Sequence, residues 1–219
     1  AEAARVHLVE ASAHLRQVQR DRLGAVTHLG DAAELPEMPL FLVVNEFFDA
    51  LPIRQFQRGP EGWAERMVTL DDAGELALGL GPPIPGAPGP QMIRETCPEA
   101  GPIVQTIAAR IAAHGGAAIA IDYGDWDGQG DTFQALRRHR PEDPLANPGE
   151  ADLTAHVDFR MIAHFAGVSG ARVSRMVTQG EWLAGLGSEG RARRLQAAGD
   201  AGAMAALHRL TAPGEMGHL

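Results

Sequence analysis

Short apolar runs, each followed by an acid or an amide, recur along the chain and limit the folds that it can adopt. The strongest is residues 40–44 (LFLVV), after which come Asn45 and Glu46. A run that is apolar on both faces is typical of a central strand in a parallel sheet, covered by helices on both sides. Residues 6–10 and 117–122 are similar runs, and both end in an acid. These runs therefore predict a buried sheet.

Segments with apolar residues at helical spacing lie between these runs. Residues 13–23 follow Ser12, which is a suitable N-cap, and residues 97–114 end at Gly115. Residues 137–149 are polar and broken by proline, so no regular element is predicted there. The remaining expectations are strands over residues 26–29 and 172–177, and helices over residues 159–166, 181–186 and 190–210. Alternating strands and helices predict an α/β fold with a parallel sheet.

Residues 53–90 differ from this pattern. Up to residue 80 they form short alternating runs, which turns at residues 59–62 and 71–74 separate. Alternation with glycine-containing turns predicts antiparallel hairpins. Residues 81–90 (GPPIPGAPGP) contain too much proline and glycine for a helix or a strand. We therefore expect an inserted antiparallel β element followed by a loop.

The balance of charge excludes some classes of function. The net charge is −9 and the sequence pI is near 5.4, so broad binding to nucleic acid or to an anionic membrane surface is not expected. No apolar run reaches the roughly 18 residues that a bilayer span needs, and no secretory signal pattern begins the chain. The single cysteine, Cys97, cannot form an intrachain disulfide, which fits a reducing compartment. The histidines show neither HxH nor HExxH spacing, so no metal site is predicted.

Acids gather at the predicted strand ends, where parallel sheets bind their ligands. Glu10 follows a strand directly and can accept hydrogen bonds from both hydroxyls of a ribose. A lone acid at such a place is equally well explained as a solvated loop residue. The acidic and amide residues at these strand ends are Glu10, Asp31, Asn45, Glu46, Asp49 and Asp122.

The run NEFFDALP (residues 45–52) is a more specific signal. It sets Glu46 and Asp49 on either side of two phenylalanines, directly after the apolar strand. Carboxylates beside aromatic residues at a sheet edge can have shifted pKa values and can hold a cationic substrate. The alternative is that the acids cap a following helix while Phe47 and Phe48 enter the core.

The pair His156 and Asp158 in the segment TAHVDF is a second candidate. In an extended chain the two side chains share one face, and a histidine beside a carboxylate can act as a base or a proton relay. Equally, Asp158 is well placed as the N-cap of the helix expected from residue 159. The sequence leaves both interpretations open.

Several longer motifs together carry a resemblance to a known family. The chain resembles the MidA-like family of S-adenosylmethionine-dependent methyltransferases, which includes the mitochondrial protein arginine methyltransferase that acts during assembly of respiratory complex I. The resemblance covers essentially all of the 219 residues, read as a partial methyltransferase domain with the insertion at about residues 53–90. The motifs that carry it, in order, are NEFFDALPIRQF, AIDYG, GDTFQALRRH, PGEADLTAHVDF, TQGEWLAGLG and PGEMGHL.

The resemblance implies a Rossmann-like methyltransferase sheet, with S-adenosylmethionine as methyl donor and a protein arginine as acceptor. It assigns Glu10 to the donor's ribose, Asp31 to its adenine and Asn45 to the donor site. Glu46 and Asp49 then face the acceptor, where Asp49 can help to hold a guanidinium bidentately.

The resemblance also implies partners and a location. A complex I subunit is the implied protein substrate, the cytoplasm is the implied location in a bacterium, and the mitochondrial matrix is the implied location in a eukaryote. A homodimer is left open. The family begins earlier, with a strand and a glycine-rich loop of the type ELGPGRG, and continues beyond MGHL, so we expect a chain cut short at both ends and inactive alone. The alternative is a non-catalytic assembly or scaffold domain that retains the methyltransferase fold.

Overall fold

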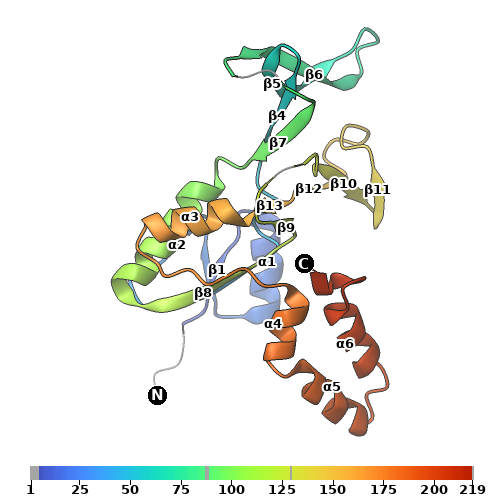
Figure 1. Cartoon of the computed structure of the whole chain (residues 1–219). Helices are drawn as coiled ribbons and strands as arrows, with labels where there is room; N and C mark the ends of the chain where they lie inside the picture. The colour runs from blue at the N-terminus through green and yellow to red at the C-terminus, as the bar shows by residue number, and fades with distance from the viewer. Residues whose placement is uncertain (1–4, 87–88, 129, 219) are drawn as a thin grey trace. The chain divides into compact units, whose positions relative to one another are not determined.

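The computed structural model of the chain describes residues 5–86, 89–128 and 130–218 (Figure 1). These residues form two compact units, and each is described by itself. The first unit is made of Ala1–Val43, Glu99–Ile119 and Met161–Val173, and the second is made of Val44–Pro98, Ala120–Arg160 and Ser174–Leu219.

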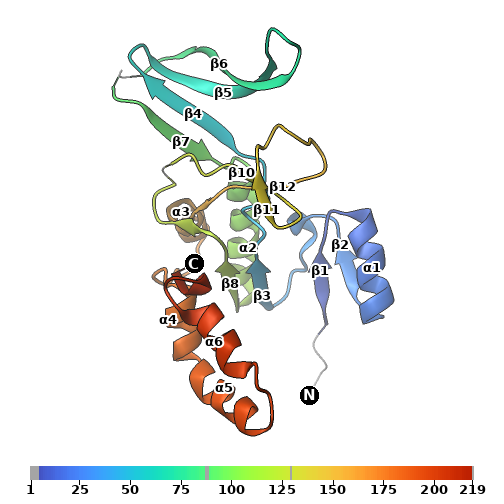
Figure 2. The same ribbon diagram turned by 90° about the vertical axis from the view of Figure 1, so that its right-hand side faces the viewer.

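The first unit begins with a parallel strand–helix–strand motif, which Figure 2 shows with its helix alongside the two strands. Strand β1 (His7–Val9) leads into helix α1 (Ala13–Leu23) and then to β2 (Thr27–Leu29), which pairs with β1 in parallel. Ser12 caps α1 as predicted, because its side chain accepts a hydrogen bond from the N–H of Leu15 at 3.2 Å.

Strands β3 (Leu40–Asn45) and β8 (Gly116–Ile121) form a second pair. The N–H of Leu40 donates to the carbonyl of Gly115, and further along, the N–H of Glu46 donates to the carbonyl of Ile121. Both bonds advance in the same direction along the two strands, so the strands are parallel. Gly116 is required where they meet, because a Cβ there would lie 1.9 Å from the carbonyl oxygen of Leu40. The mixed α/β class that the sequence predicts is therefore confirmed, although β1–β2 and β3–β8 are separate sheets among the described residues.

The core of the first unit lies between these strands and α2 (Ala100–His114). Helix α2 presents its apolar face to buried residues of β2, β3 and the 3-10 helix η1 (Ala32–Glu34). The isoleucines at helical spacing that predicted this helix, Ile103, Ile107 and Ile111, are the residues that pack there.

One expectation for β3 is wrong. The run LFLVV predicted a strand buried on both faces, but Phe41 is 86% exposed and Val43 is 73% exposed. Leu40 and Leu42 point into the core instead, so the strand alternates. An apolar run cannot by itself show which faces are covered, because the cover comes from other elements.

A four-stranded antiparallel sheet dominates the second unit (Figure 1). The order across the sheet is β6-β5-β4-β7, and the turns fall at the two places that the sequence indicated. Strand β6 continues through residues that were expected to be loop, and residues 87 and 88 of that loop lie outside the described residues. The strands are β4 (Arg54–Gly59), β5 (Gly62–Leu70), β6 (Leu76–Ile84) and β7 (Met92–Thr96).

Residues 137–149, where no regular element was predicted, contribute to a small antiparallel sheet. Its order is β11-β10-β12, and a separate parallel pair joins β9 to β13. The β10–β11 turn consists of Arg138 and His139, both with positive φ. Such a turn normally carries Asn-Gly, and without that pair no hairpin is predicted from these residues. The strands are β9 (Gly124–Asp125), β10 (Gln134–Arg137), β11 (Arg140–Glu142), β12 (Asp152–Thr154) and β13 (Val157–Asp158).

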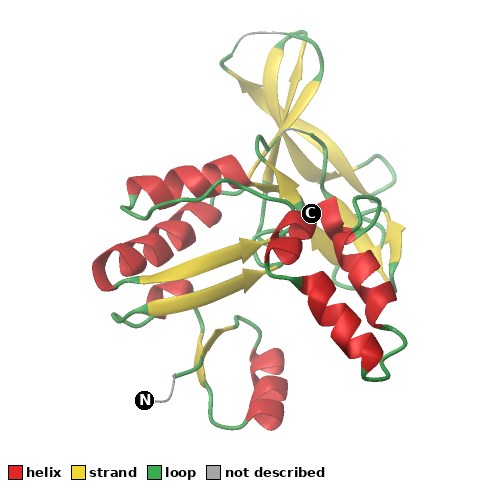
Figure 3. Ribbon diagram, turned by 60° about the horizontal axis from the view of Figure 1, so that its bottom comes forward, coloured by secondary structure: helices red, strands yellow, loops and turns green. Residues whose placement is uncertain are grey.

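Helix α3 (Phe159–Val168) follows β13, and a helical group ends the chain (Figure 3). The helical stretch expected over residues 190–210, with glycine interruptions, is two helices, because the chain turns at Gly199, which has a φ of 103°. The strand expected over residues 172–177 is absent from this described segment, where Val173 is 48% exposed. The helical group is α4 (Gln179–Gly185), α5 (Ser188–Ala197), α6 (Ala203–Thr211) and the 3-10 helix η2 (Met216–His218). None of the helices in the described ranges is long and apolar enough to cross a membrane.

Candidate active site

The candidate site lies in the second unit, where the chain leaves β3. Glu46 has a φ of 44°, which places a non-glycine residue in the left-handed region. Such backbone strain costs on the order of 1–3 kcal/mol and persists only where surrounding contacts impose it. One of those contacts is the 2.9 Å hydrogen bond from the N–H of Glu46 to the carbonyl of Ile121.

Asp122 holds the three residues that follow Glu46. Its Oδ2 atom accepts three backbone N–H groups in a row, at 3.1, 2.9 and 3.3 Å, from Phe47, Phe48 and Asp49. Its Oδ1 atom accepts the N–H of Tyr123 at 2.9 Å. Burial raises the pKa of Asp122, and these N–H groups oppose the rise. The Asp122 carboxylate therefore fixes the path of the NEFFD loop.

Asp49, in the same loop, has a side-chain oxygen that lacks a hydrogen-bond partner. It is 6% exposed, and its Oδ1 atom is buried without a hydrogen-bond partner. Burial, together with the negative charges of Asp122 and Glu46, raises the pKa of Asp49 to about 6. Buried carboxylate oxygens are normally hydrogen-bonded, so an unpartnered one among like charges indicates a place for a donor or a cation.

Glu46 supplies a second carboxylate, and it is exposed. The hydroxyl of Tyr123 donates to Glu46 Oε1 at 3.2 Å. Burial, and then the charge of Glu46, raises the pKa of Tyr123, so the phenol stays protonated and keeps this donor role. The site therefore combines an accessible carboxylate held by a phenol with a buried carboxylate that has a vacant acceptor.

Residues 155–157 run alongside the site and are hydrogen-bonded to the backbone of Asp49 and Tyr123. The N–H of Ala155 donates to the carbonyl of Asp49 at 3.1 Å, and the N–H of Val157 donates to the carbonyl of Tyr123 at 2.8 Å. Gly124 permits the close approach, since a Cβ there would lie 2.2 Å from the carbonyl oxygen of Val157.

The second predicted pair lies on the same segment. His156 is exposed, and its backbone N–H donates to Thr132 Oγ1 at 2.8 Å. Asp158 is half-buried beside Gly128 and directly precedes α3, where a cap would stand. The backbone of His156 lies between two residues that bond to the site, Ala155 and Val157. A role for the His156 ring in proton transfer remains a prediction.

Two of the residues predicted to bind the cofactor belong to the first unit. Glu10 and Asp31 follow the neighbouring parallel strands β1 and β2, so they share one sheet edge. Glu10 accepts the N–H of Ser12 at 2.8 Å and the amide of Gln19 at 3.3 Å. Asp31 caps η1 by accepting the N–H of Ala33 at 2.7 Å. Both carboxylates are thus oriented and retain free acceptor capacity.

The third residue predicted to bind the cofactor, Asn45, ends β3 and is exposed. It precedes Glu46, so the structure keeps it with the acids of the second unit. The alternative in which Glu46 and Asp49 cap a helix is wrong, because residues 46–53 contain no helix. That alternative also placed Phe47 and Phe48 in the core, and of the two only Phe48 is buried, at 4% exposed, while Phe47 is half-buried.

The supporting roles of Asp122 and Tyr123 at this site are not predictable from the local sequence. Asp122 was noted as a strand-end acid, but its role as a hydrogen-bond acceptor for a distant loop has no local signal. Tyr123 adjoins it in the motif AIDYG, so its neighbourhood was the available signal. Within the ranges described above, no group of three or more His, Cys, Asp or Glu side chains could hold a metal ion.

The chain is similar in sequence to one family of proteins. Residues 1–177 match the family described as putative S-adenosyl-L-methionine-dependent methyltransferase. The mitochondrial protein arginine methyltransferase NDUFAF7 of Xenopus tropicalis is 34% identical over 215 residues, which are 83% of this chain and 50% of that protein. The human protein of the same name is 34% identical over 195 residues, covering 74% of this chain and 44% of the relative. The chain spans about half the length of the curated relatives it matches.

A solved structure shows the same fold. A likely methyl transferase of the COG1565 superfamily from Burkholderia thailandensis, bound to S-adenosyl-homocysteine, is 30% identical with a TM-score of 0.82. The match covers 98% of this chain and 62% of that protein. A native crystal structure from the same superfamily and organism is 29% identical with a TM-score of 0.83, covering 98% and 64%.

Proposed function

Because this chain belongs to the family of putative S-adenosyl-L-methionine-dependent methyltransferases, we propose that it forms the acceptor-binding part of a protein arginine N-methyltransferase. The observation that carries the proposal is the unpartnered, buried Oδ1 of Asp49 beside the accessible carboxylate of Glu46. A guanidinium offers several N–H donors and a positive charge, which is what these two acids lack.

Residues of the first unit fit the methyl donor. S-adenosylmethionine, when bound, supplies an electrophilic methyl group. Glu10 would accept its ribose hydroxyls, because the Glu10 carboxylate stands at a strand end and is already oriented by Ser12 and Gln19. Asp31, which follows the neighbouring strand of the same pair, would lie near the adenine. Asn45 belongs to the second unit, and its assignment to the donor rests on the family resemblance alone.

The acids of the second unit would position the acceptor. Glu46 can meet an incoming cation from solvent, while Asp49 supplies a second negative charge in a water-poor place. Two carboxylates that share one guanidinium restrict its orientation, and positioning supplies much of the catalysis in a direct displacement. The acceptor nitrogen would gain the methyl group, leave S-adenosyl-homocysteine behind and lose a proton, which Asp49 Oδ1 could take because the pKa of Asp49 is raised to about 6. His156 and Asp158 are proposed to relay that proton onward.

The substrate class follows from the relatives. The curated relatives are named as mitochondrial protein arginine methyltransferases. We extend this to an arginine on a protein of respiratory complex I, in the cytoplasm of a bacterium or the mitochondrial matrix of a eukaryote. The site itself supports a cationic nitrogen acceptor, and the relatives favour arginine over a small amine.

The test is methyl transfer from labelled S-adenosylmethionine by the full gene product. We expect label on arginine side chains of a protein fraction prepared from cells that lack the gene, read by peptide mass spectrometry. Transfer only to small amines would contradict the arginine assignment. Tight binding of S-adenosylmethionine with no transfer to any acceptor would favour a scaffold domain instead.

A further inference from the structure

We propose that Thr132 is a positioning residue for the Glu46–Asp49 site, and that Glu95 on β7 holds Thr132 in place. The inference rests on the proposed function, because it assumes that these two acids bind the methyl acceptor. Neither Thr132 nor Glu95 touches either acid in the contacts described above, so their influence would pass through the backbone of residues 155–157.

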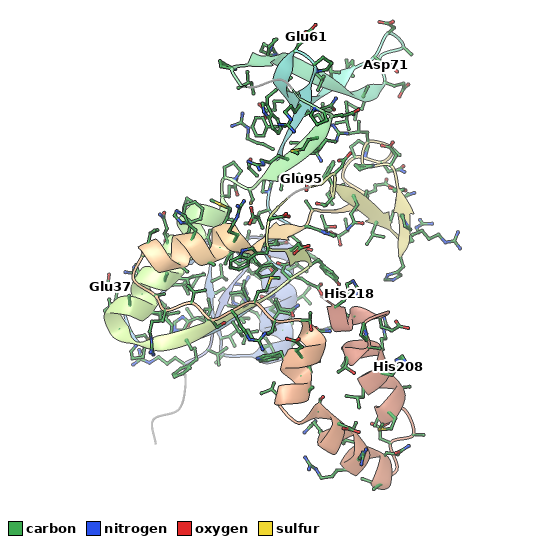
Figure 4. All side chains as sticks on the ribbon, viewed as in Figure 1. Glu37, Glu61, Asp71, Glu95, His208 and His218 are labelled. Carbon is green, nitrogen blue, oxygen red and sulfur yellow. The ribbon has the colours of Figure 1, made fainter. Side chains whose placement is uncertain are left out.

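Glu95 is a buried carboxylate, and both of its oxygens accept hydrogen bonds. It is 7% exposed, and Figure 4 labels it on β7. Its Oε1 atom accepts the amide of Gln55 at 2.7 Å and the N–H groups of Thr132 and Phe133 at 3.0 and 3.1 Å. Its Oε2 atom accepts the hydroxyl of Thr132. Glu95 thereby fixes both the backbone and the side chain of Thr132.

The residue before Thr132 is anchored as well. Asp131 accepts the amide of Gln55 at 2.9 Å and the guanidinium of Arg66 at 2.8 Å. Gln55 lies on β4 and Arg66 on β5, so three strands of the antiparallel sheet hold the loop that carries Thr132. Asp131 and Thr132 are therefore both anchored to this sheet.

The Thr132 hydroxyl has a fixed polarity. Its hydrogen is donated to Glu95, so its oxygen is left as an acceptor, and it receives the N–H of His156 at 2.8 Å. Because the same hydroxyl bonds to Glu95 and to the N–H of His156, the position of Glu95 determines where the backbone of His156 can lie.

Residues 155–157 are held from both sides as a result. In an extended chain, successive N–H groups point in opposite directions. Those of Ala155 and Val157 go to the carbonyls of Asp49 and Tyr123, and that of His156 goes to Thr132. Without the Thr132 hydroxyl, the N–H of His156 would lose its partner, and only the bonds to Asp49 and Tyr123 would remain of these three.

The experiment compares Thr132→Val with Thr132→Ser in the full gene product. Valine keeps the shape but removes the donor to Glu95 and the acceptor for His156, whereas serine keeps both. We expect Val to slow single-turnover methyl transfer by about 10- to 100-fold at saturating S-adenosylmethionine, the scale of a small misplacement in an active site. The serine variant should stay within about threefold of the parent, and the dissociation constant for S-adenosylmethionine should be unchanged in both.

Thr69→Val is the matched control, because Thr69 is an exposed threonine on β5 of the same sheet. It should transfer methyl at the parent rate. If Thr132→Val does not fold, Glu95→Gln takes its place, with an expected loss of about 3- to 30-fold. A folded Thr132→Val or Glu95→Gln protein with the parent rate overturns the proposal.

Amide hydrogen exchange separates this proposal from the proposed function. Exchange at residues 155–157 should be faster in Thr132→Val than in Thr132→Ser, whether or not methyl transfer occurs. A parent protein that transfers no methyl group contradicts the proposed function alone. Unchanged exchange in the valine variant contradicts the positioning role alone.

Discussion

The burial of Asp49 lowers the stability of the fold but favours the binding of a cation. A carboxylate that is 6% exposed, with one unpartnered oxygen and acidic neighbours, weakens the fold when it is ionised. The same features give a cation a strong reason to bind there. Residues of this kind are found where a site is maintained at the expense of stability.

The Asp49→Asn variant should therefore be more stable than the parent at neutral pH. The pKa of Asp49 is raised from 3.8 to about 6, so the folded state keeps a proton that the unfolded state has lost between about pH 4 and 6. Stability of the parent consequently falls as the pH rises through this window and is lowest above it. The shift corresponds to at most about 3 kcal/mol, all of it expressed above pH 6.

Thermal melts at pH 4 and pH 8 check this. Asparagine does not titrate, so its advantage should be present at pH 8 and absent at pH 4. An Asp49→Asn protein that is less stable than the parent at pH 8 would show that the ionised carboxylate makes a favourable contact.

Glu10→Ala tests the donor site at the level of one residue. We expect it to weaken binding of S-adenosylmethionine by about 1.5–3 kcal/mol, the scale of hydrogen bonds to a charged group. Calorimetry on the full gene product measures it, with Glu34→Ala as the control, since Glu34 on η1 accepts the N–H of Gly30 near the same sheet edge. An unchanged dissociation constant would mean that Glu10 is a solvated loop acid.

At the level of elements, the sequence was informative wherever local chemistry sets the structure. Glycine-containing turns predicted the β4–β5 and β5–β6 hairpins, and Ser12 predicted the start of α1. The sheet of β10, β11 and β12 was missed because its turn lacks glycine. The exposed face of β3 was missed because burial depends on distant elements.

Placing Asn-Gly at the β10–β11 turn tests whether the lack of glycine there costs stability. Arg138 and His139 have φ values of 52° and 62°, which asparagine and glycine adopt far more readily. Replacing them with Asn-Gly should stabilise the protein by roughly 1–2 kcal/mol. A thermal melt reads the gain, and Ala-Ala at the same positions is the control that removes the side chains without favouring the turn. A lower melting temperature for Asn-Gly than for Ala-Ala would contradict it.

At the level of the whole molecule, the donor candidates fall in both units, since Asn45 belongs to the second, whereas the acceptor candidates fall in the second unit alone. Glu10 and Asp31 belong to the first, and Glu46 and Asp49 belong to the second. Strand-end acids were predictable because parallel strands place them at one edge. The supporting residues were not, since Thr132 and Glu95 are separated by 37 positions and meet only in the folded chain.

The central claim is that Glu46 and Asp49 hold the methyl acceptor. Glu46→Gln and Asp49→Asn keep the shape of each side chain and remove its charge, so the packing of Phe47 and Phe48 should survive. Losing one charge contact in the transition state would cost roughly 2–4 kcal/mol, or on the order of 30- to 1000-fold in rate. Glu61→Gln is the matched control, because Glu61 lies exposed at the β4–β5 turn (Figure 4).

Single-turnover methyl transfer at saturating S-adenosylmethionine is the measurement that decides. We expect both variants to bind the donor within about twofold of the parent, to remain folded, and to transfer methyl at the lower rates given above, while Glu61→Gln keeps the parent rate. If Glu46→Gln and Asp49→Asn remain folded and transfer methyl as fast as the parent, the two acids do not hold the acceptor.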